Sequence, residues 1–127
     1  MATLTPSSTR AVATDVQRAL RTIEDVRSKL DLTYKQIAEV VAADESTLHR
    51  WRAQESEPSR AHLRTLMALR EFMSELFRTF SNPSDAKDWL VTRNQGFGNR
   101  RPLEILLEGK IERLTASIVG FNLGMMT

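Results

Sequence analysis

The sequence predicts an all-α protein with about seven helices. Apolar residues recur at spacings of three and four along most of the chain, as they do on the buried face of a helix. No run of residues alternates between apolar and polar side chains in the way that indicates a strand. The 127 residues include only five glycines and four prolines, which is low for a disordered or all-β chain.

The first helix is expected to run from Ala11 to Leu30, after a disordered tail at residues 1–10. The tail is rich in small and hydroxylated side chains and has no apolar core. The apolar positions of the helix follow the pattern i, i+4, i+8, i+11, which places them on one face. They are Val12, Val16, Leu20, Ile23, Val26 and Leu30.

Two short helices are expected next. Thr33 precedes the second helix and is followed three residues later by Gln36, which is the spacing of a capping box. Asp44 is the expected N-cap of the third helix, and the polar residues 54–59 with Pro58 among them end it. The apolar residues of these two helices are Ile37, Val40, Val41, Leu48 and Trp51.

The longest helix is expected between Ser59 and Phe80. A helix that is apolar on two sides usually packs against two neighbours, or against one neighbour and a second copy of the chain. We therefore expect a homodimer or a larger assembly. The apolar residues that cover the two sides are Leu63, Leu66, Met67, Leu69, Phe72, Met73, Leu76, Phe77 and Phe80.

Three further helices are expected in the C-terminal third. Residues 81–84 should end the long helix and begin the fifth, because their proline suits a first helical turn. Residues 93–101 contain two glycines without an apolar period and are expected to form a loop. Pro102 should open a short sixth helix that Gly109 ends, and the seventh helix begins at Ile111.

Residues 32–51 have the pattern of a helix-turn-helix, in which a turn of about three residues joins two short helices. Ala38 is small where the helices would cross, and the apolar residues on both sides of the turn would form an internal wedge. The other residues of the second helix would then point outward, as base-reading residues do. The segment resembles an Xre or lambda-repressor-type helix-turn-helix. The candidate DNA contacts are Tyr34, Glu45, Ser46, Thr47, His49, Arg50 and Arg52.

A helical packing module without DNA binding is the alternative interpretation of this pattern. Ala42 occupies the turn position that usually holds glycine, and alanine in a left-handed turn costs roughly 1 kcal/mol. The acid at Glu45 repels phosphate, although it can accept a hydrogen bond from a cytosine amino group. Residues 1–58 carry eight basic and nine acidic side chains, so this half of the chain is not a basic domain.

The C-terminal third contains a second pattern. It consists of Trp89-Leu90, a polar loop with Asn94, the sequence Arg101-Pro102-Leu103-Glu104, then Gly109, a helix and Gly124. This pattern resembles the C-terminal toxin-binding domain of the MbcA/ParS/Xre antitoxin family. Together with the helix-turn-helix, the resemblance covers about residues 30–127. It implies a helix-turn-helix domain with a long connecting helix at 11–80 and a toxin-binding domain at 81–127.

The resemblance implies an antitoxin of a type II toxin–antitoxin system. Members of the family pair with RES-domain toxins, which degrade NAD⁺, and tend to bind their own promoter. The expected partners are therefore a cognate RES-domain toxin and operator DNA. The family places the C-terminal end near the active site of the toxin. The candidate toxin contacts are Trp89, Arg93, Asn94, Arg100, Arg101, Phe121, Met125, Met126 and Thr127.

The residues themselves do not decide whether these positions contact a toxin. The loop that follows Trp89 carries three arginines and no acid, and arginines can form bidentate bonds with a partner. A solvated loop accounts for them equally well. The apolar terminus, with its two methionines, suits either a binding site or core packing of Phe121 beside a frayed end.

Enzymatic activity, a cofactor and a metal site are not expected. The chain has no cysteine, and its two histidines, His49 and His62, fall on different predicted helices, each on the surface or at DNA. The Gly96-Phe97-Gly98 sequence has no preceding strand and no third glycine, so it does not indicate a dinucleotide site. The longest apolar stretch, residues 116–126, is too short to span a membrane, and no signal peptide is visible. We therefore expect a cytoplasmic protein.

Two other functions remain open from the sequence. The chain could be a stand-alone helix-turn-helix transcription regulator whose C-terminal region only dimerises. It could also be an interaction module whose helix-turn-helix no longer binds DNA, which the residues at positions 42 and 45 would favour.

Overall fold

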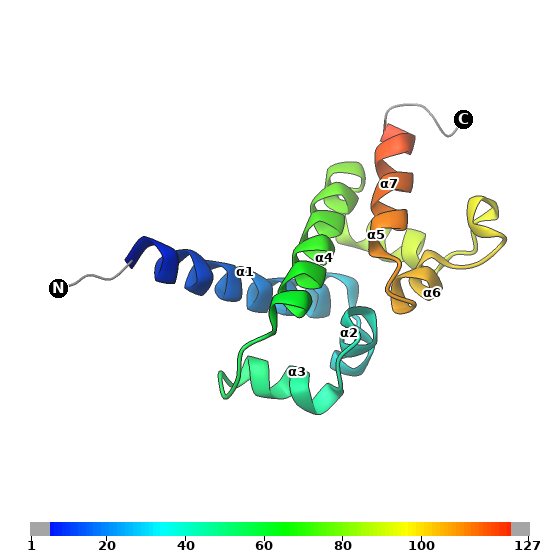
Figure 1. Cartoon of the computed structure of the whole chain (residues 1–127). Coiled ribbons are helices and arrows are strands. Elements are labelled where there is room, and N and C mark those ends of the chain that lie inside the picture. The colour runs from blue at the N-terminus through cyan, green and yellow to red at the C-terminus, as the bar shows by residue number, and fades with distance from the viewer. Residues whose placement is uncertain (1–5, 123–127) are drawn as a thin grey trace.

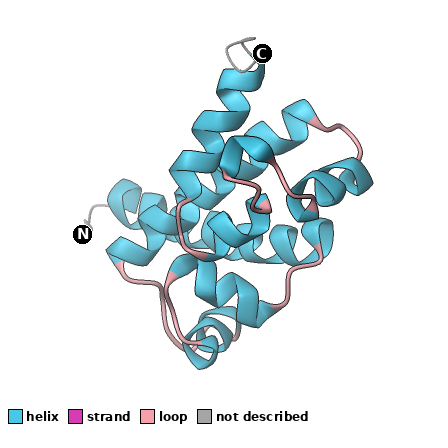
Figure 2. Cartoon of the chain, turned by 90° about the vertical axis from the view of Figure 1, so that its right-hand side faces the viewer, coloured by secondary structure: helices cyan, strands magenta, loops and turns pink. Residues whose placement is uncertain are grey.

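A computed structural model describes the backbone of residues 6–122 and the side chains of residues 14–120. Within residues 6–122 the chain forms seven α-helices and one short 3-10 helix, and no strand. Figure 2 shows the helices joined by short loops. The predicted all-α class is therefore confirmed. The helices are α1 Pro6–Leu30, α2 Tyr34–Val41, α3 Glu45–Arg52, α4 Arg60–Thr79, α5 Pro83–Val91, α6 Pro102–Leu107 and α7 Ile111–Asn122, with the 3-10 helix η1 at Gln95–Phe97.

The first helix begins at Pro6, five residues before the predicted start at Ala11. The prediction of a disordered tail at 1–10 is therefore wrong for residues 6–10. The hydroxylated residues of this segment have modest helix propensity but do not break a helix. A proline at the first helical position is also well tolerated, because its missing N–H would have no partner there.

Side-chain caps set the starts of three of the other α-helices. The backbone N–H of Gln36 donates to Thr33 Oγ1 at 3.1 Å, and the backbone N–H of Thr33 donates to Gln36 Oε1 at 2.9 Å. This reciprocal pair is the predicted capping box. Ser59 and Asn82 cap α4 and α5 in the same way through their side-chain oxygens. Asp44 occupies the N-cap of α3 as predicted, but its side chain accepts no capping hydrogen bond.

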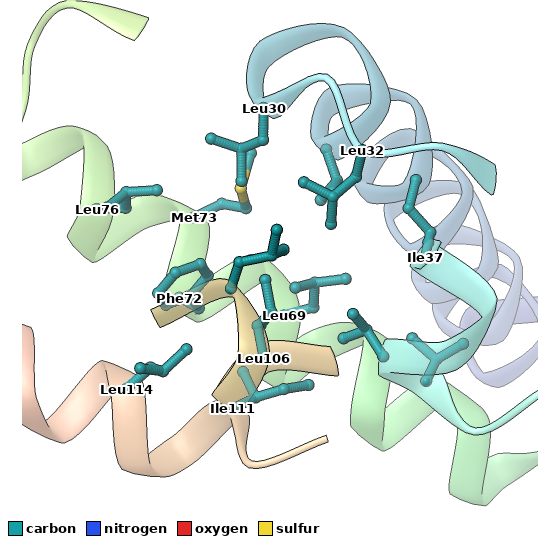
Figure 3. Close-up of a cluster of buried hydrophobic side chains, with 14 of the residues drawn as sticks. Leu30, Leu32, Ile37, Leu69, Phe72, Met73, Leu76, Leu106, Ile111 and Leu114 are labelled. Carbon is teal, nitrogen blue, oxygen red and sulfur yellow. The ribbon is translucent and has the colours of Figure 1, made fainter. Parts of the chain in front are cut away.

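Helix α4 crosses α1 and runs beside α7 (Figure 1). The two apolar sides predicted for this helix therefore have their two neighbours within a single chain. Figure 3 shows side chains from α2, α4, α6 and α7 and from the end of α1 pointing toward one another. Leu69 and Phe72 of α4 are fully buried there, and so are Leu106 of α6 and Leu114 of α7. One core thus continues across the predicted boundary between residues 80 and 81.

Ala42 ends α2 in the left-handed conformation, with φ 59° and ψ 46°. Because a Cβ atom strains this conformation, Ala42→Gly is expected to raise the free energy of unfolding by up to about 1 kcal/mol. Ala53, the exposed alanine that ends α3, has an ordinary φ of −82°. Ala53→Gly is therefore the matched control, and it should lower stability by roughly 0.5 kcal/mol. Urea unfolding of both variants tests this, and a loss of stability in both would contradict it.

Candidate functional site

The first candidate surface is built by α2, the turn at residues 42–44 and α3. The backbone N–H of Ala43 donates to the Ala38 carbonyl at 2.9 Å, which closes the turn. The predicted internal wedge is confirmed, because none of its side chains exceeds 2 % exposure; they are Ile37, Val41, Leu48 and Trp51. Ala38 is equally buried between the two helices. This segment therefore consists of two short helices that a turn joins and that pack against each other through these side chains, as the predicted helix-turn-helix requires.

The outer face of α3 carries the predicted DNA-contacting residues. Glu45, Ser46, His49 and Arg50 are exposed, and Thr47 is half-buried. The guanidinium of Arg50 donates to Thr47 Oγ1 at 3.0 Å, and His49 Nε2 lies 3.4 Å from a carboxylate oxygen of Glu45. The expected outward placement of these residues is confirmed, while their contact with DNA remains a prediction.

Tyr34 and Arg52 lie at the edge of this face and are held by α1. Arg52 Nε donates to one carboxylate oxygen of Glu24 at 2.7 Å, and the Tyr34 hydroxyl donates to the other at 2.8 Å. The Arg52 guanidinium also lies 3.8 Å from the centre of the Tyr34 ring, a favourable cation–π distance. These contacts fix the C-terminal end of α3 against α1. They also use some of the Arg52 N–H donors that could otherwise bind a phosphate.

Opposing effects act on the pKa values of this cluster. Burial acts to raise the pKa of Glu24, but the hydrogen bonds from Arg52 and Tyr34 outweigh it and leave the pKa below its ordinary value. The hydrogen bond to Glu24 raises the pKa of Tyr34. Glu24 carries no signal in the sequence, because it lies on an exposed part of α1 and is 28 residues away from Arg52.

His62 has a packing role that its sequence context did not reveal. Its half-buried ring lies edge-on to Trp51, with 5.0 Å between ring centroids. Ring atom Nδ1 is 2.9 Å from Ser59 Oγ. The residue therefore braces the start of α4 against the end of α3 from a half-buried position at the surface, and a contact of His62 with DNA stays a prediction.

The second candidate surface is an apolar groove of about 370 Å³ formed by the end of α4, α5, η1 and α7. Trp89 is at its centre, with ring centroids 6.0 Å from Phe80 and 6.4 Å from Phe97. Of the predicted toxin contacts, this groove brings together Trp89 and Asn94. The remaining lining residues, which the sequence analysis did not place in the site, are Thr79, Phe80, Phe97, Ser117 and Ile118. Phe97 could not be recognised because the surrounding loop has no apolar period.

Asn94 organises the loop beside the groove. Its backbone N–H donates to the Arg100 carbonyl at 3.0 Å, and its Oδ1 accepts from the backbone N–H of Gly96 at 2.7 Å. The Arg93 guanidinium donates to the Asn99 carbonyl at 3.0 Å. The loop is therefore closed by its own hydrogen bonds, and Arg93 takes part in that closure.

Arg100 and Arg101 are paired with acids that the sequence analysis did not assign to them. Arg100 forms an ion pair with Glu108, and Arg101 Nε lies 3.3 Å from Glu104 Oε2. Hydrogen bonds from Arg100 and Lys110 lower the pKa of Glu108. The loop itself lacks acids, as the sequence shows, but α6 and the residue after it supply them. Both arginines can still contact a partner, although they would do so as members of ion pairs.

Several predicted toxin contacts cannot be placed. Met125, Met126 and Thr127 lie outside the described residues. Phe121 belongs to α7, but its side chain also lies outside the described part. Among the described residues there is no cluster of metal-ligating side chains, and no helix of the described chain is long and apolar enough to cross a membrane.

One family model matches the part of the chain that forms most of the second surface. Residues 75–116 match the family model of the antitoxin Xre/MbcA/ParS C-terminal toxin-binding domain. The match begins in α4, ends in α7 and includes five of the seven residues that line the groove. The resemblance carried by the sequence motifs of the C-terminal third is therefore confirmed.

Two further comparisons cover most of the chain. It is 24 % identical over 97 residues to the mycobacterial cidal antitoxin MbcA of Mycobacterium tuberculosis strain H37Rv and, equally, of Mycobacterium bovis. These 97 residues are 76 % of this chain and 85 % of each relative. The fold is similar to a chain in the crystal structure of the M. tuberculosis MbcT–MbcA toxin–antitoxin complex, with a TM-score of 0.63 and 23 % identity. That match covers 85 % of this chain and 96 % of the other.

Proposed function

We propose that the protein is the antitoxin of a toxin–antitoxin system, because residues 75–116 match the Xre/MbcA/ParS C-terminal toxin-binding domain. It binds and inhibits a RES-domain toxin that degrades NAD⁺, and it is not itself an enzyme. The observation that carries the proposal is the apolar groove around Trp89, most of which lies within the matched segment. Apolar grooves with aromatic side chains at their centre are typical of protein interfaces.

Inhibition would involve two parts of the C-terminal region. The groove around Trp89 takes an apolar segment of the toxin, and Arg100 and Arg101, which are ion-paired at the start of α6, contribute polar contacts. The terminal residues after α7 enter the active-site cleft of the toxin. A methionine pair adapts to an apolar pocket.

Trp89→Ala tests the groove. We expect toxin affinity to fall by at least about 2 kcal/mol, as for a buried aromatic at the centre of an interface. Val91, which is 50 % exposed on the same helix and does not line the groove, provides the control Val91→Ala. Affinity is measured by titration calorimetry with the cognate RES-domain toxin, and a melting curve checks that each variant folds. A folded Trp89→Ala protein that inhibits normally would overturn the assignment of the groove.

The helix-turn-helix supports a second part of the proposal, repression of the operon by DNA binding in the cytoplasm. The exposed face of α3 presents hydroxyl, imidazole, carboxylate and guanidinium groups, which are the groups that read base edges in the major groove. A homodimer would place two such helices at neighbouring half-sites. Since α1 and α7 cover both sides of α4, a dimer would have to use other surfaces, such as the groove that Val16, Leu63 and Met67 line.

Arg50→Ala is expected to weaken operator binding by about 1–3 kcal/mol if this side chain makes a bidentate base contact. Toxin inhibition should be unchanged, because α3 does not contribute to the groove around Trp89. Arg113→Ala is a matched control, since Arg113 is an exposed arginine on α7 and not on α3. Fluorescence anisotropy with a promoter fragment at several salt concentrations measures the effect. Equal affinities for both variants would contradict the assigned face.

The alternative function is that of a stand-alone transcription regulator. The helix-turn-helix, considered without the C-terminal region, favours this function. Copurification distinguishes the two. An antitoxin forms a stable complex with the cognate RES-domain toxin, whereas a stand-alone regulator binds the promoter and leaves that protein free.

A further inference from the structure

A cleft of about 320 Å³ lies between α1 and α4, where the two helices cross (Figure 1). Its lining residues come from these two helices alone, so it is separate from the outer face of α3 and from the groove around Trp89. Met73 and Phe77 of α4 form its apolar part. Neither the helix-turn-helix nor the C-terminal region accounts for it.

The cleft brings together four basic side chains from two helices: Arg18, Arg21 and Lys29 of α1, and Arg70 of α4. Asp25 is the one acid among its lining residues. Cations that converge in this way repel one another, and the repulsion is relieved when an anion enters between them.

The basic groups of the cleft are also poorly paired. Within the described part of the chain, no hydrogen bond or ion pair is formed by the side chains of Arg21 and Arg70. Arg18 is only 3.9 Å from Asp15, at the limit of an ion pair, and Lys29 lies over the ring of Phe77 at 5.6 Å. By contrast, Arg52, Arg100 and Arg101 all have carboxylate partners.

We propose that this cleft binds a small anion that carries two adjacent phosphate groups. Arginine presents a planar fork that matches phosphate oxygens two at a time. Arg21 and Arg70 approach from opposite walls and would each hold one phosphate, while Arg18 and Lys29 add charge. The exposed hydroxyl of Ser74 can donate a further hydrogen bond. The hydroxyl of Thr22 cannot, because it already donates to the Arg18 carbonyl at 2.9 Å.

Such a ligand would bridge α1 and α4, which are both part of the shared core. Because it binds the folded chain and not the unfolded one, it would stabilise the fold in proportion to its concentration. The cleft would thus make the stability of the antitoxin responsive to a phosphorylated metabolite. This site does not depend on toxin binding or DNA binding, so its test is independent of the proposed function.

Pyrophosphate is the probe for this site, titrated into the full-length protein at low ionic strength. Calorimetry should show saturable binding with one site per chain, and the melting temperature should rise with ligand concentration. Inorganic phosphate at equal ionic strength should bind at least about tenfold more weakly, because it engages one arginine fork rather than two. Equal responses to both anions would show ionic screening alone and would overturn the proposal.

Three variants give results of different sign. Arg70→Ala should weaken pyrophosphate binding about tenfold or more, since it removes one charged bidentate contact. Asp25→Asn should tighten binding, because it removes the acid from the cleft. Arg64→Ala is the matched control on α4, because Arg64 lies outside the cleft, and it should bind as the parent does. Unchanged binding in folded Arg70→Ala, or equal losses in Arg70→Ala and Arg64→Ala, would place the anion elsewhere.

Discussion

Deleting Met125–Thr127 is expected to abolish toxin inhibition while leaving the melting curve of the antitoxin unchanged. Residues 125–127 follow Gly124, and a glycine commonly ends a helix, so their loss should cost little stability. If they fill the centre of the toxin's cleft, their removal costs several kcal/mol of binding, which is about a thousandfold in affinity. Growth rescue on co-expression with the toxin and calorimetry of the purified pair measure the loss.

Two controls separate a binding role from a structural one. Deleting Thr127 alone keeps both methionines, so it tests their contribution separately. Operator binding by the three-residue deletion should be normal, because α3 is far from the end of α7 along the chain. Full growth rescue by the deletion would locate inhibition in the groove around Trp89. A collapsed melting temperature would show that the terminus belongs to the core.

Phe72→Ala is expected to have the largest effect on folding. Phe72 is fully buried in α4, in the cluster that α1, α6 and α7 also join. Truncation of a buried phenylalanine costs about 3–5 kcal/mol, a large fraction of the roughly 5–15 kcal/mol that stabilises a domain. Because both halves share this core, operator binding and toxin inhibition should be lost together and in a single unfolding transition.

The comparison with an exposed apolar residue makes this prediction specific. Val91→Ala removes methyl groups from a side chain that is half exposed and should change stability by less than about 0.5 kcal/mol. Urea denaturation followed by circular dichroism and by the fluorescence of the two tryptophans gives the free energies. Two separate transitions in Phe72→Ala, one from each tryptophan, would contradict a shared core.

The sequence was sufficient where local patterns decide the structure. The capping box at Thr33, the wedge that ends at Trp51 and the proline that opens α6 all depend on residues a few positions apart. Their helices were therefore predicted closely. The start of α1 was missed because residues 6–10 have no apolar period that would indicate a helix. Their weak helix propensity, and a proline at the first position, do not prevent one from forming.

Contacts between distant segments could not be read from these patterns. Glu24 meets Arg52 only because the fold brings the end of α3 near α1, and the sequence has no signal for that pairing. In the same way, Phe97 becomes part of the groove only after η1 folds toward α5 and α7. Helical periodicity identifies which face is apolar, but not which other helix covers it.

The position of α4 between α1 and α7 also has a consequence during synthesis of the chain. α7 is the last helix that the structure describes and is synthesised after α1 and α4, yet it covers the side of α4 that α1 does not. The helices made first can therefore complete their packing only after residues 111–122 have left the ribosome. We expect a chain that stops before Ile111 to lack a complete core, so under the proposed function only molecules that include α7 would occupy the promoter.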